Sequence, residues 1–386
     1  MQEQHQMIYD LVDDFGKKEL LHRGYPDLER KAEFPVFFPK RLAELELAGM
    51  SFPEEYGGMD ADTISTSITA ERIAYYCPSD QLIWTASHGL AGFPIMTFGN
   101  EEQKKKYLPR LASGEVLGCY ALTEPEAGSD AASIKASAEY SQKSGKTYYT
   151  INGTKVFITN ADEASVCVLF ARRKFVVDKH KAITAFVFET DGPGLKRDGI
   201  SVRTIAKRCL RSSHFCEIVF DGLVLEEGDV LGNMDSGFKI AMETLNNGRI
   251  NIAAQSVGIA RRALHEAVEY AKVRKTFGKA LITRQDIAFK LADLKTRIEL
   301  AWLGTLEASR AKDAGEDYVE KASMAKLFAS ETAKDTALYM LEVMGGIGCT
   351  EEYILADQIF QDARITTIYE GTSNVQKMVI AKSFNK

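Results

Sequence analysis

The sequence predicts an α+β protein built from an N-terminal helical domain, a middle antiparallel β domain and a C-terminal four-helix bundle. Apolar residues recur at intervals of three and four in the first and last thirds of the chain, whereas short β-branched and aromatic runs fill the middle third. Helices and strands are thus segregated, which excludes the alternating pattern of a doubly wound fold. We place the domains at 1–115, 116–228 and 229–386. A chain of 386 residues is long enough to bury such cores.

The first domain is predicted to be helical from the spacing of its apolar residues. The segments FPVFFPKRLAELELAGM (34–50) and AERIAYYC (70–77) carry apolar side chains three and four positions apart. Between residues 100 and 115, NEEQKKKYLPRLASGE predicts two polar helices broken at Pro109, because proline lacks a backbone donor and clashes with the preceding turn.

The middle domain is predicted from four runs rich in Val, Ile, Phe, Tyr and Thr. These runs lie at 146–159, 164–172, 182–189 and 216–225. Asn152-Gly153 stands between two runs of this kind, and this dipeptide is the strongest short signal for a hairpin turn, so we expect a hairpin there. The basic segment ARRKFVVDKHK (171–181) is predicted to be a solvated hairpin loop.

The last domain is predicted to contain long helices packed side by side. Two stripes of apolar residues run through it at helical spacing. The first stripe is Ile250, Ala253, Val257, Ala260, Leu264, Val268 and Ala271, and the second is Ile287, Leu291, Leu294, Ile298, Trp302 and Leu306.

The glycine-rich stretch MGGIGC (344–349) follows a helix predicted at 335–343. It lacks the full GxGxxG spacing and does not follow a strand, so it does not predict a dinucleotide-binding loop, and the sequence has no Walker motif. Two interpretations stay open for these glycines: a helix C-terminus capped by glycine, or a backbone that a ligand approaches closely.

Composition and charge restrict the function. The net charge of −6 and the pI of about 5.7 come without a basic block, so we expect no nucleic acid partner. No apolar run reaches the roughly 18 residues of a membrane span, and the N-terminal segment shows no signal pattern. The sequence therefore predicts a cytoplasmic protein.

Six cysteines lie singly in the chain, mostly in apolar surroundings: Cys77, Cys119, Cys167, Cys209, Cys216 and Cys349. None belongs to a CxxC pair or stands at a ligand-like distance from a histidine, so we predict buried, reduced thiols and no metal site. The six scattered histidines give no support for a His-based relay, and nothing signals a cysteine or serine nucleophile.

Near the C-terminus, IYEGTSNVQ (368–376) places a carboxylate in a glycine-containing bend. A helix is predicted to begin at Thr372 or Ser373, because Ser373 and Gln376 are spaced for a capping box. Taken alone, Glu370 is best interpreted as a solvated turn carboxylate, since charged loop residues are usually exposed.

A second polar cluster lies in CYALTEPEAGSD (119–130), a loop that leaves a predicted strand. Thr123 and Ser129 supply hydroxyl groups, and Gly128 exposes backbone N–H groups. This combination is suited to gripping a planar polar ligand. A turn capped by an aspartate is the alternative that these residues leave open.

Five ordered motifs resemble those of the acyl-CoA dehydrogenase family. They are ALTEPEAGSD (121–130), KVFITNA (155–161), YAKVRKTFGK (270–279) followed by Gln285, MGGIG (344–348) and IYEGTS (368–373). The resemblance covers essentially the whole chain, including its order of helices, strands and helices. It implies an FAD enzyme without a Rossmann fold, whose cofactor lies between the β domain, the C-terminal helices and a neighbouring subunit.

The resemblance implies the cofactor contacts residue by residue. Those in the β domain are Tyr120, Leu122, Thr123, Gly128, Ser129, Phe157, Ile158 and Thr159. Those in the C-terminal domain are Arg274, Phe277, Gln285, Glu342, Gly345, Gly346, Thr372 and Asn374. Thr123 and Ser129 match partners of the flavin ring. Arg274 matches a grip on the diphosphate from across a subunit boundary, for which a permanently charged, bidentate guanidinium is suited.

Within this resemblance Glu370 matches the general base that removes the α-proton of an acyl thioester, while the β-hydrogen leaves as hydride to flavin N5. Its backbone N–H, with a cofactor hydroxyl, matches the site that polarises the thioester carbonyl. The family has a second position for the base, and in this chain Gly248 stands there. Of the two positions, only residue 370 therefore carries a carboxylate. The expected substrate contacts are Ser129, Asn246, Arg249, Tyr369 and Gly371.

Several positions depart from the family pattern. Phe157 replaces a common Trp, Glu342 a Gln, and Asn246 an Asp. Glu342 therefore adds a charge at an expected cofactor contact. Cys209 and Ser212 replace glycines, so we expect their loop to differ in shape.

Substrate choice is predicted from SDQLIWTASHG (79–89), which matches the wall of the acyl pocket. Gln81 stands where glutaryl-CoA enzymes carry an arginine, which argues against a diacid. Trp84 has two interpretations: a plug that favours short or branched chains, or a buried structural tryptophan. We expect a short-chain or branched acyl-CoA.

The resemblance also implies partners. They are an acyl thioester, an electron-transferring flavoprotein, and further copies of the chain in a homotetramer arranged as a dimer of dimers. Two enzymatic alternatives stay open: an acyl group carried on a carrier protein, and enoyl-CoA reduction. A catalytically silent assembly or binding protein is the alternative outside enzymes, and the presence of Glu370, Thr159 and Arg274 argues against it.

Overall fold

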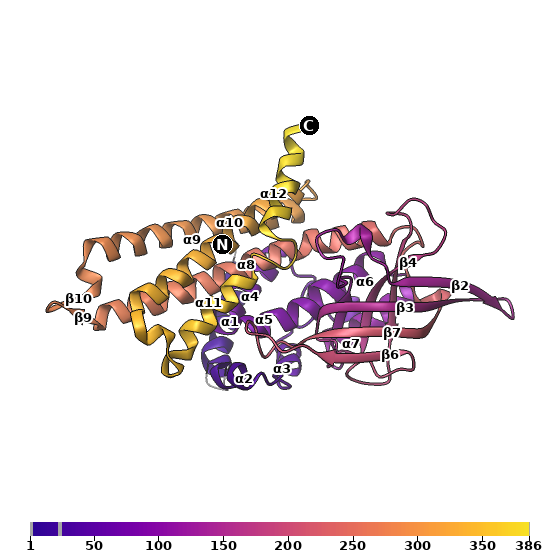
Figure 1. The fold of residues 1–386 in the computed structure, drawn as a ribbon, viewed down its shortest axis with the longest axis horizontal. Helices are drawn as coiled ribbons and strands as arrows, with labels where there is room; N and C mark the ends of the chain where they lie inside the picture. The colour runs from indigo at the N-terminus through magenta and orange to yellow at the C-terminus, as the bar shows by residue number, and fades with distance from the viewer. Residues whose placement is uncertain (1–2, 22–24, 386) are drawn as a thin grey trace.

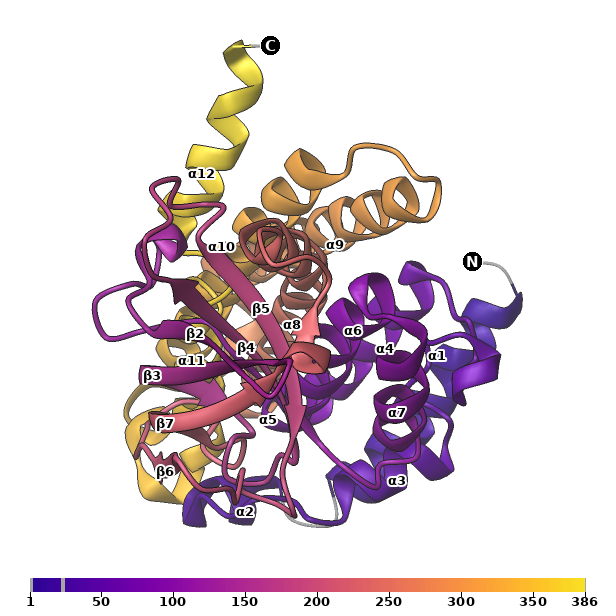
Figure 2. The ribbon, with the colours of Figure 1, turned by 90° about the vertical axis from the view of Figure 1, so that its right-hand side faces the viewer.

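The computed structural model describes residues 3–21 and 25–385. The molecule is elongated: a β-sheet occupies one end, long C-terminal helices extend to the other, and the N-terminal helices lie against both (Figure 1). Seen from the sheet end, the N-terminal helices and the sheet stand side by side, and the last helix projects away from the body (Figure 2). The predicted boundaries after residues 115 and 228 stay a prediction.

Helices make up the first part, as predicted. Their bounds are α1 Glu3–Phe15, α2 Tyr25–Lys31, α3 Phe38–Glu44, α4 Thr63–Tyr76, α5 Pro78–Trp84, α6 Phe93–Phe98 and α7 Glu101–Ala112. The predicted break at Pro109 is wrong, because α7 continues through it. Pro109 lies in the last turn, where it removes one helical donor, and its own carbonyl still accepts from Ser113 N at 2.9 Å.

The middle part is one sheet of short strands. Their bounds are β1 Gly118–Ala121, β2 Ser137–Lys143, β3 Lys146–Thr159, β4 Val166–Arg173, β5 Ile183–Glu189, β6 Ile200–Thr204, β7 Phe215–Glu226 and β8 Val230–Leu231. The strand order is β6-β7-β3-β2-β4-β5-β8, with β1 beside β4. Neighbours pair antiparallel except β1 with β4 and β2 with β4, which pair parallel. Of the basic segment predicted as a loop at 171–181, residues 174–181 are the mostly exposed connection between β4 and β5, with Phe175 and Val177 fully exposed, whereas 171–173 are the end of β4 and Ala171 is buried.

The hairpin predicted at Asn152-Gly153 is wrong. The chain reverses earlier, at Ser144 and Gly145, whose φ values of 53° and 78° are those of a two-residue hairpin turn. Asn152 and Gly153 instead lie within β3, at a register shift against β7. Gly153 has φ 147°, and a Cβ there would lie 2.6 Å from Ala136 Cα. The dipeptide therefore marks a bulge with close backbone approach and not a turn.

Long helices form the last part. Their bounds are α8 Gly237–Val273, α9 Gln285–Asp313, α10 Val319–Met344, α11 Ile354–Ile365 and α12 Ser373–Ala381, and the two-stranded hairpin β9 Lys275–Thr276 and β10 Lys279–Ala280 joins α8 to α9. The two predicted apolar stripes lie in α8 and α9 and pack into one core with α10 and α11. The predicted bundle of four helices is confirmed.

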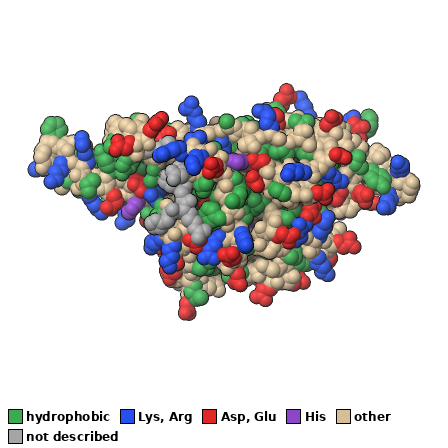
Figure 3. Space-filling model, turned by 90° about the horizontal axis from the view of Figure 1, so that it is seen from below, with side chains coloured by type: hydrophobic (Ala, Val, Ile, Leu, Met, Phe, Trp, Pro, Cys, Tyr) green, Lys and Arg blue, Asp and Glu red, His purple; other side chains and the backbone are tan. Residues whose placement is uncertain are grey.

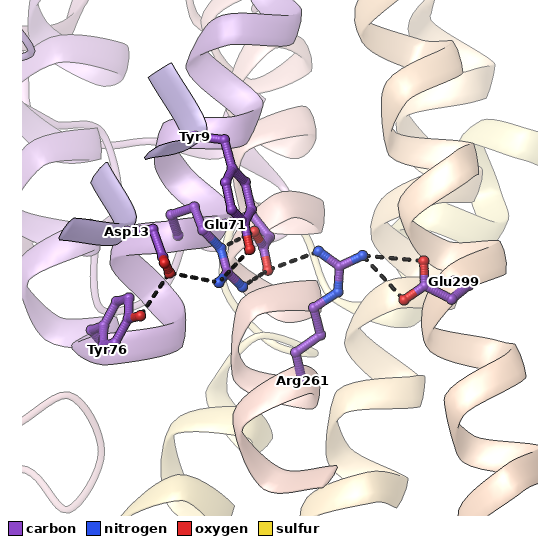
Figure 4. A network of polar contacts seen from close by, with 7 residues as sticks. Tyr9, Asp13, Glu71, Tyr76, Arg261 and Glu299 are labelled. Atoms are coloured by element: carbon purple, nitrogen blue, oxygen red, sulfur yellow. Dashed lines mark hydrogen bonds and ion pairs between the residues drawn. The ribbon is translucent and has the colours of Figure 1, made fainter. Parts of the chain in front are cut away.

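A partly buried network of charges joins the N-terminal helices to the bundle (Figure 4). Glu71 and Arg72, both on α4, form a two-pronged ion pair with N···O distances of 2.6 and 2.5 Å, and Arg72 also reaches Asp13 on α1. From α8, Arg261 binds Glu71 at 3.1 Å and Glu299 on α9 at 3.2 Å. The network therefore fixes α8 against α4 and α9.

The surface and the cysteines bear on the remaining predictions. On the face shown in Figure 3, positive and negative side chains are interspersed and no basic patch gathers. Among the described residues no helix is long and apolar enough to cross a membrane, and no group of His, Cys, Asp or Glu side chains is arranged to hold a metal ion. All six cysteines are free thiols, but Cys349 is exposed and Cys209 half-buried, so burial was predicted wrongly for these two.

Candidate active site

The turn that carries Glu370 lies between α11 and α12. Glu370 and Gly371 have successive φ values of 53° and 89°, a left-handed conformation that is rare for a residue with a side chain. Two side chains hold the turn from opposite sides. Lys326 Nζ donates to the Gly371 carbonyl at 2.8 Å, and Gln376 Nε2 donates to the carbonyls of Glu370 and Gly371 at 3.1 and 2.8 Å.

The start of α12 differs from the predicted capping box. Thr372 is the N-cap, since its side chain accepts from Val375 N at 3.3 Å. Ser373 instead donates to Glu331 on α10 at 2.6 Å. Gln376 turns back to the carbonyls of the preceding turn, so both predicted capping side chains have other partners. The predicted helix start is nevertheless confirmed.

The Glu370 side chain points at α8. A Cβ built on Gly248 would lie 2.7 Å from Glu370 Oε2 and 3.1 Å from Oε1, so the carboxylate occupies the space that the missing side chain of Gly248 leaves. Oε2 is buried, and within the described residues it has no hydrogen-bond partner. The interpretation of Glu370 as a solvated turn carboxylate is therefore wrong. A buried carboxylate oxygen without a partner is available to a ligand or a proton.

Burial raises the pKa of Glu370 to about 7, while the positive charges of Arg249 and Lys326 act to lower it. Arg249 on α8 is 5% exposed and donates from Nη1 to Asn246 Oδ1 at 2.6 Å and to Ser323 Oγ at 3.4 Å. Asn246, Arg249 and Glu370, all predicted site residues, are thus brought together. The carboxylate changes its charge state within the physiological pH range.

Tyr369, the residue before Glu370, is anchored to other helices. Its hydroxyl donates to the side-chain carbonyl of Gln255 on α8, and burial raises the pKa of the phenol well above its usual value. Gln255 Nε2 in turn donates to the Pro78 carbonyl at the start of α5, at 3.1 Å. Gln255 is a positioning residue that the sequence analysis did not name.

A buried ion pair holds the polar loop that follows β1, within residues 119–130. Lys155 Nζ lies 2.7 Å from Glu124 Oε1 and 2.9 Å from the Leu122 carbonyl, and Lys155 is fully buried. Leu122 and Tyr120 are buried, Thr123 is half-buried, and Gly128 and Ser129 are exposed. The alternative of a turn capped by an aspartate is wrong, because the Asp130 side chain caps no backbone N–H.

The end of β3 presents an aromatic ring. Phe157 is 60% exposed, has φ 60°, and sits at a register shift against β7. Its ring meets Phe215 edge-on, with ring centroids 5.6 Å apart. Ile158 is buried and Thr159 half-buried. A left-handed residue at a bulge turns this ring out of the sheet, which leaves an aromatic face free for a ligand.

The predicted contacts for the adenosine end lie elsewhere. Arg274, Phe277 and Gln285 are exposed around the β9–β10 hairpin, at the end of the long helices opposite to the sheet (Figure 1). In one chain they are therefore not brought together with Thr123 or Phe157. Phe277 is 96% exposed with φ 51°.

A pocket of about 330 Å³ lies beside this hairpin. Arg274, Glu342, Gly345 and Gly346 line it, which brings residues of two separate sequence motifs, YAKVRKTFGK and MGGIG, together with Glu342. Gly345 also ends α10 with φ 63°, so the interpretation as a helix cap is confirmed. The close approach of a ligand to this backbone stays a prediction. Thr372 and Asn374 belong to the start of α12, in a different part of the bundle.

Three family profiles match the chain: the acyl-CoA dehydrogenase N-terminal domain at 2–115, the middle domain at 119–223 and the C-terminal domain at 235–384. The chain belongs to the acyl-CoA dehydrogenase family. The acyl-CoA dehydrogenase resemblance, the three-part architecture and the FAD-dependent oxidoreductase class predicted from the sequence are confirmed.

Individual acyl-CoA dehydrogenase relatives match over nearly the full length. The human mitochondrial short-chain specific acyl-CoA dehydrogenase is 38% identical, with 98% of this chain and 89% of the relative covered. Butyryl-CoA dehydrogenase from Megasphaera elsdenii has a TM-score of 0.94 and 36% identity, with 100% and 99% covered. A chain in the structure titled for the electron transferring flavoprotein of Acidaminococcus fermentans has a TM-score of 0.93 and 35% identity, with 100% and 98% covered.

The residues present fit the FAD of an acyl-CoA dehydrogenase. A Cβ at Gly128 or Gly346 would meet no atom within 4 Å, so nothing inside this chain requires glycine there, and both positions leave room for a group from outside. The exposed Phe157 ring and the hydroxyls of Thr123 and Ser129 would hold the flavin.

The loop that departs from the acyl-CoA dehydrogenase pattern is held by a carboxylate. Glu29 on α2 accepts from the backbone N–H groups of Arg211 and Ser212, at 2.7 and 3.1 Å, and from the Ser212 hydroxyl at 2.5 Å. Leu210 N donates to Asp362 on α11 at 2.6 Å. The loop thus gains a polar anchor through the serine that replaces a glycine.

The predicted acyl-pocket wall contains a structural tryptophan. Trp84 is 3% exposed, donates from Nε1 to the Leu47 carbonyl at 3.0 Å, and stacks on His88 with centroids 4.9 Å apart. The second interpretation of Trp84 is therefore the correct one. Gln81 is fully buried and donates to Thr85 Oγ1 at 2.7 Å, so no charged group stands at this place.

The sequence analysis missed Lys326, which donates a hydrogen bond to the turn that carries Glu370. A signal was present: Lys326 interrupts a helical stripe of small buried residues on α10, namely Ala322, Ala329, Ala333 and Ala337. A lysine at a core position of a helix requires a polar partner, so it points to a buried acceptor. Which acceptor it meets depends on tertiary contacts with the turn at 370–371.

Proposed function

We propose that this chain oxidises short-chain acyl-CoA thioesters to their α,β-unsaturated products, with Glu370 as the general base. The single observation that carries the assignment is the buried, unpartnered Oε2 of Glu370, set against the gap at Gly248. The short-chain class is supported by the human short-chain relative and by the butyryl-CoA dehydrogenase structure. It does not rest on Trp84.

The chemistry of the chain's own residues follows from this placement. FAD, when bound, supplies the acceptor for the β-hydrogen. Glu370 takes the α-proton, and burial gives its carboxylate a proton affinity near the working pH, which is what a general base needs. The backbone N–H of Glu370 makes no hydrogen bond to protein within the described residues, so it can donate to the thioester carbonyl. Gly371 lets the thioester approach this backbone closely.

The remaining assigned contacts extend the proposal. The predicted substrate contacts keep their roles as part of the proposal: Ser129, Asn246, Arg249, Tyr369 and Gly371. The cofactor contacts implied by the family motifs, including Glu342, keep their predicted roles as part of the proposal. The protein acts in the cytoplasm, as the sequence predicts.

The proposed partners are an electron-transferring flavoprotein and further copies of the chain. The structure titled for an electron transferring flavoprotein supports the first. Large apolar side chains exposed on α9 and α10 support a homotetramer, since exposed apolar patches mark interfaces. They are Phe289, Leu300, Leu303, Met324, Phe328 and Leu338. In a dimer of dimers Arg274 and Phe277 would reach the cofactor of a neighbour, so sedimentation of the flavin-loaded protein should show four copies and no active monomer.

The test of the function is anaerobic mixing of the flavin-loaded protein with acyl-CoA thioesters of different length. Butyryl-CoA should bleach the flavin fastest, with long straight chains slower by at least tenfold. Glutaryl-CoA should react poorly, because no positive charge at Gln81 would pair with its distal carboxylate. A protein that purifies without flavin, or a flavin that no thioester bleaches, would support the silent binding protein instead.

The pH dependence of the reaction should report Glu370. The base acts when ionised, so kcat/KM should fall about tenfold per pH unit below the pKa of Glu370, reach half its maximum near pH 7, and level off above it. The measurement is the rate of flavin bleaching by butyryl-CoA at low concentration, from about pH 5.5 to pH 9. A rate that is flat between about pH 6 and pH 8 would show that no group with this pKa governs the step.

A further inference from the structure

Lys326 is a lysine in the core of the C-terminal domain. It lies on α10, facing the bundle interior, and is fully buried. Placing an ammonium group out of contact with water is unfavourable unless hydrogen bonds or opposite charges compensate. A lysine buried at such a position therefore requires specific partners.

The partner of Lys326 is the catalytic turn. Its Nζ donates to the Gly371 carbonyl at 2.8 Å. Burial lowers the pKa of Lys326 to about 7, the charges of Glu370 and Glu331 raise it, and Arg249 lowers it. At pH values up to about 7 the Lys326 amine therefore carries a positive charge that acts on the Glu370 carboxylate.

The carbonyl that Lys326 holds belongs to a strained turn. Glu370 and Gly371 are both left-handed, and a residue with a side chain keeps this conformation only where neighbours impose it. Lys326 and Gln376 donate to the same Gly371 carbonyl from α10 and α12. Together they close the turn that presents the Glu370 carboxylate to α8.

Among the described residues, the titratable groups that interact electrostatically with the Glu370 carboxylate are Arg249 from α8, Lys326 from α10, Tyr120 from β1, and Tyr369 from the turn itself. Both tyrosines are neutral, since burial raises the pKa of each well above its usual value. The positive charges that oppose protonation of the base are therefore Arg249 and Lys326.

We propose that Lys326 is a positioning residue for the base: its N–H group fixes the left-handed turn through the Gly371 carbonyl, and its positive charge keeps the Glu370 carboxylate ionised. The inference rests on the proposed function of Glu370. It assigns two separable effects to one side chain, a hydrogen bond and a charge, and the two effects have different signatures.

Two substitutions separate these effects. Lys326→Gln retains an N–H donor for the Gly371 carbonyl and removes the charge, whereas Lys326→Met has a similar length and removes both. Loss of a nearby positive charge raises the pKa of a carboxylate by about 1 unit or more. In both variants the midpoint of the kcat/KM profile should therefore move to higher pH, with a loss of about tenfold at pH 6 that is largely recovered at pH 9.

Amide hydrogen exchange across residues 368–373 tests the hydrogen bond without substrate. In Lys326→Met these amides should exchange at least tenfold faster than in the wild type. In Lys326→Gln their exchange rates should stay within about threefold of the wild-type rates. Lys321→Met is the matched control, because Lys321 lies on the same helix in exposed ion pairs with Glu307 and Glu316. It should change neither the pH midpoint nor the exchange.

Each outcome decides one part of the inference. An unchanged pH midpoint in both Lys326 variants would overturn the role of the charge, and unchanged exchange in Lys326→Met would overturn the role of the hydrogen bond. The exchange arm separates this inference from the proposed function. Suppose that no thioester bleaches the flavin of the wild type, but that Lys326→Met still speeds amide exchange in the turn. That result would overturn the role of Glu370 in catalysis and would retain the role of Lys326 in holding the turn.

Discussion

Glu370→Gln should bind FAD as the wild type does and lose about 10²- to 10⁴-fold in turnover, the range typical of a general base. The reason is that an amide has nearly the shape of a carboxylate but does not accept a proton at neutral pH. The turn at 370–371 is held through its backbone carbonyls by Lys326 and Gln376, so the substitution leaves these contacts in place. A 10²-fold loss corresponds to about 2.7 kcal/mol of transition-state stabilisation.

The measurement has two parts: the ratio of flavin to protein absorbance, and the rate of flavin bleaching by butyryl-CoA in a single turnover. Glu352→Gln is the control, because Glu352 is an exposed carboxylate on the same domain. It should keep the wild-type rate within twofold. A Glu370→Gln variant that retains more than a tenth of the wild-type rate would remove Glu370 from the role of base.

The fold was predictable where local pattern and tertiary structure agree. The helical stripes of α8 and α9 and the β-branched runs of the sheet are features of spacing and residue type, and each is confirmed. Local signals failed where a contact distant in sequence outweighs them. Asn152-Gly153 favours a turn, but pairing with β7 and the approach of Ala136 make it a bulge.

The site was predictable only in part. The motifs identify Glu370 and the loop at 119–130 because they are continuous in sequence. The side chains that hold the turn are not continuous with it: Lys326 and Gln255 come from α10 and α8, and nothing in sequence spacing connects them to Glu370. The same limit applies to Trp84, whose bond to the Leu47 carbonyl distinguishes a structural tryptophan from a pocket plug.

The placement of the base against Gly248 predicts the second large effect. Gly248→Ala should lose at least 10²-fold in turnover, because the added Cβ would lie 2.7 Å from Glu370 Oε2 and would push the carboxylate out of its place. The helix itself tolerates alanine better than glycine, so the variant should unfold no more easily than the wild type. Gly304→Ala on α9 is the control, since a Cβ there would meet no atom within 4 Å.

The same geometry predicts that the base can be moved. In the double variant Glu370→Gly with Gly248→Glu, the space vacated at residue 370 receives a carboxylate from α8, and the glycine removes the left-handed strain of the turn. It should recover at least tenfold over Glu370→Gly alone. The test compares single-turnover bleaching by butyryl-CoA in the two variants. If both variants hold FAD and their rates are equal, a carboxylate at residue 248 does not reach the proton that Glu370 removes. That result would contradict the interpretation that the base occupies the space beside Gly248.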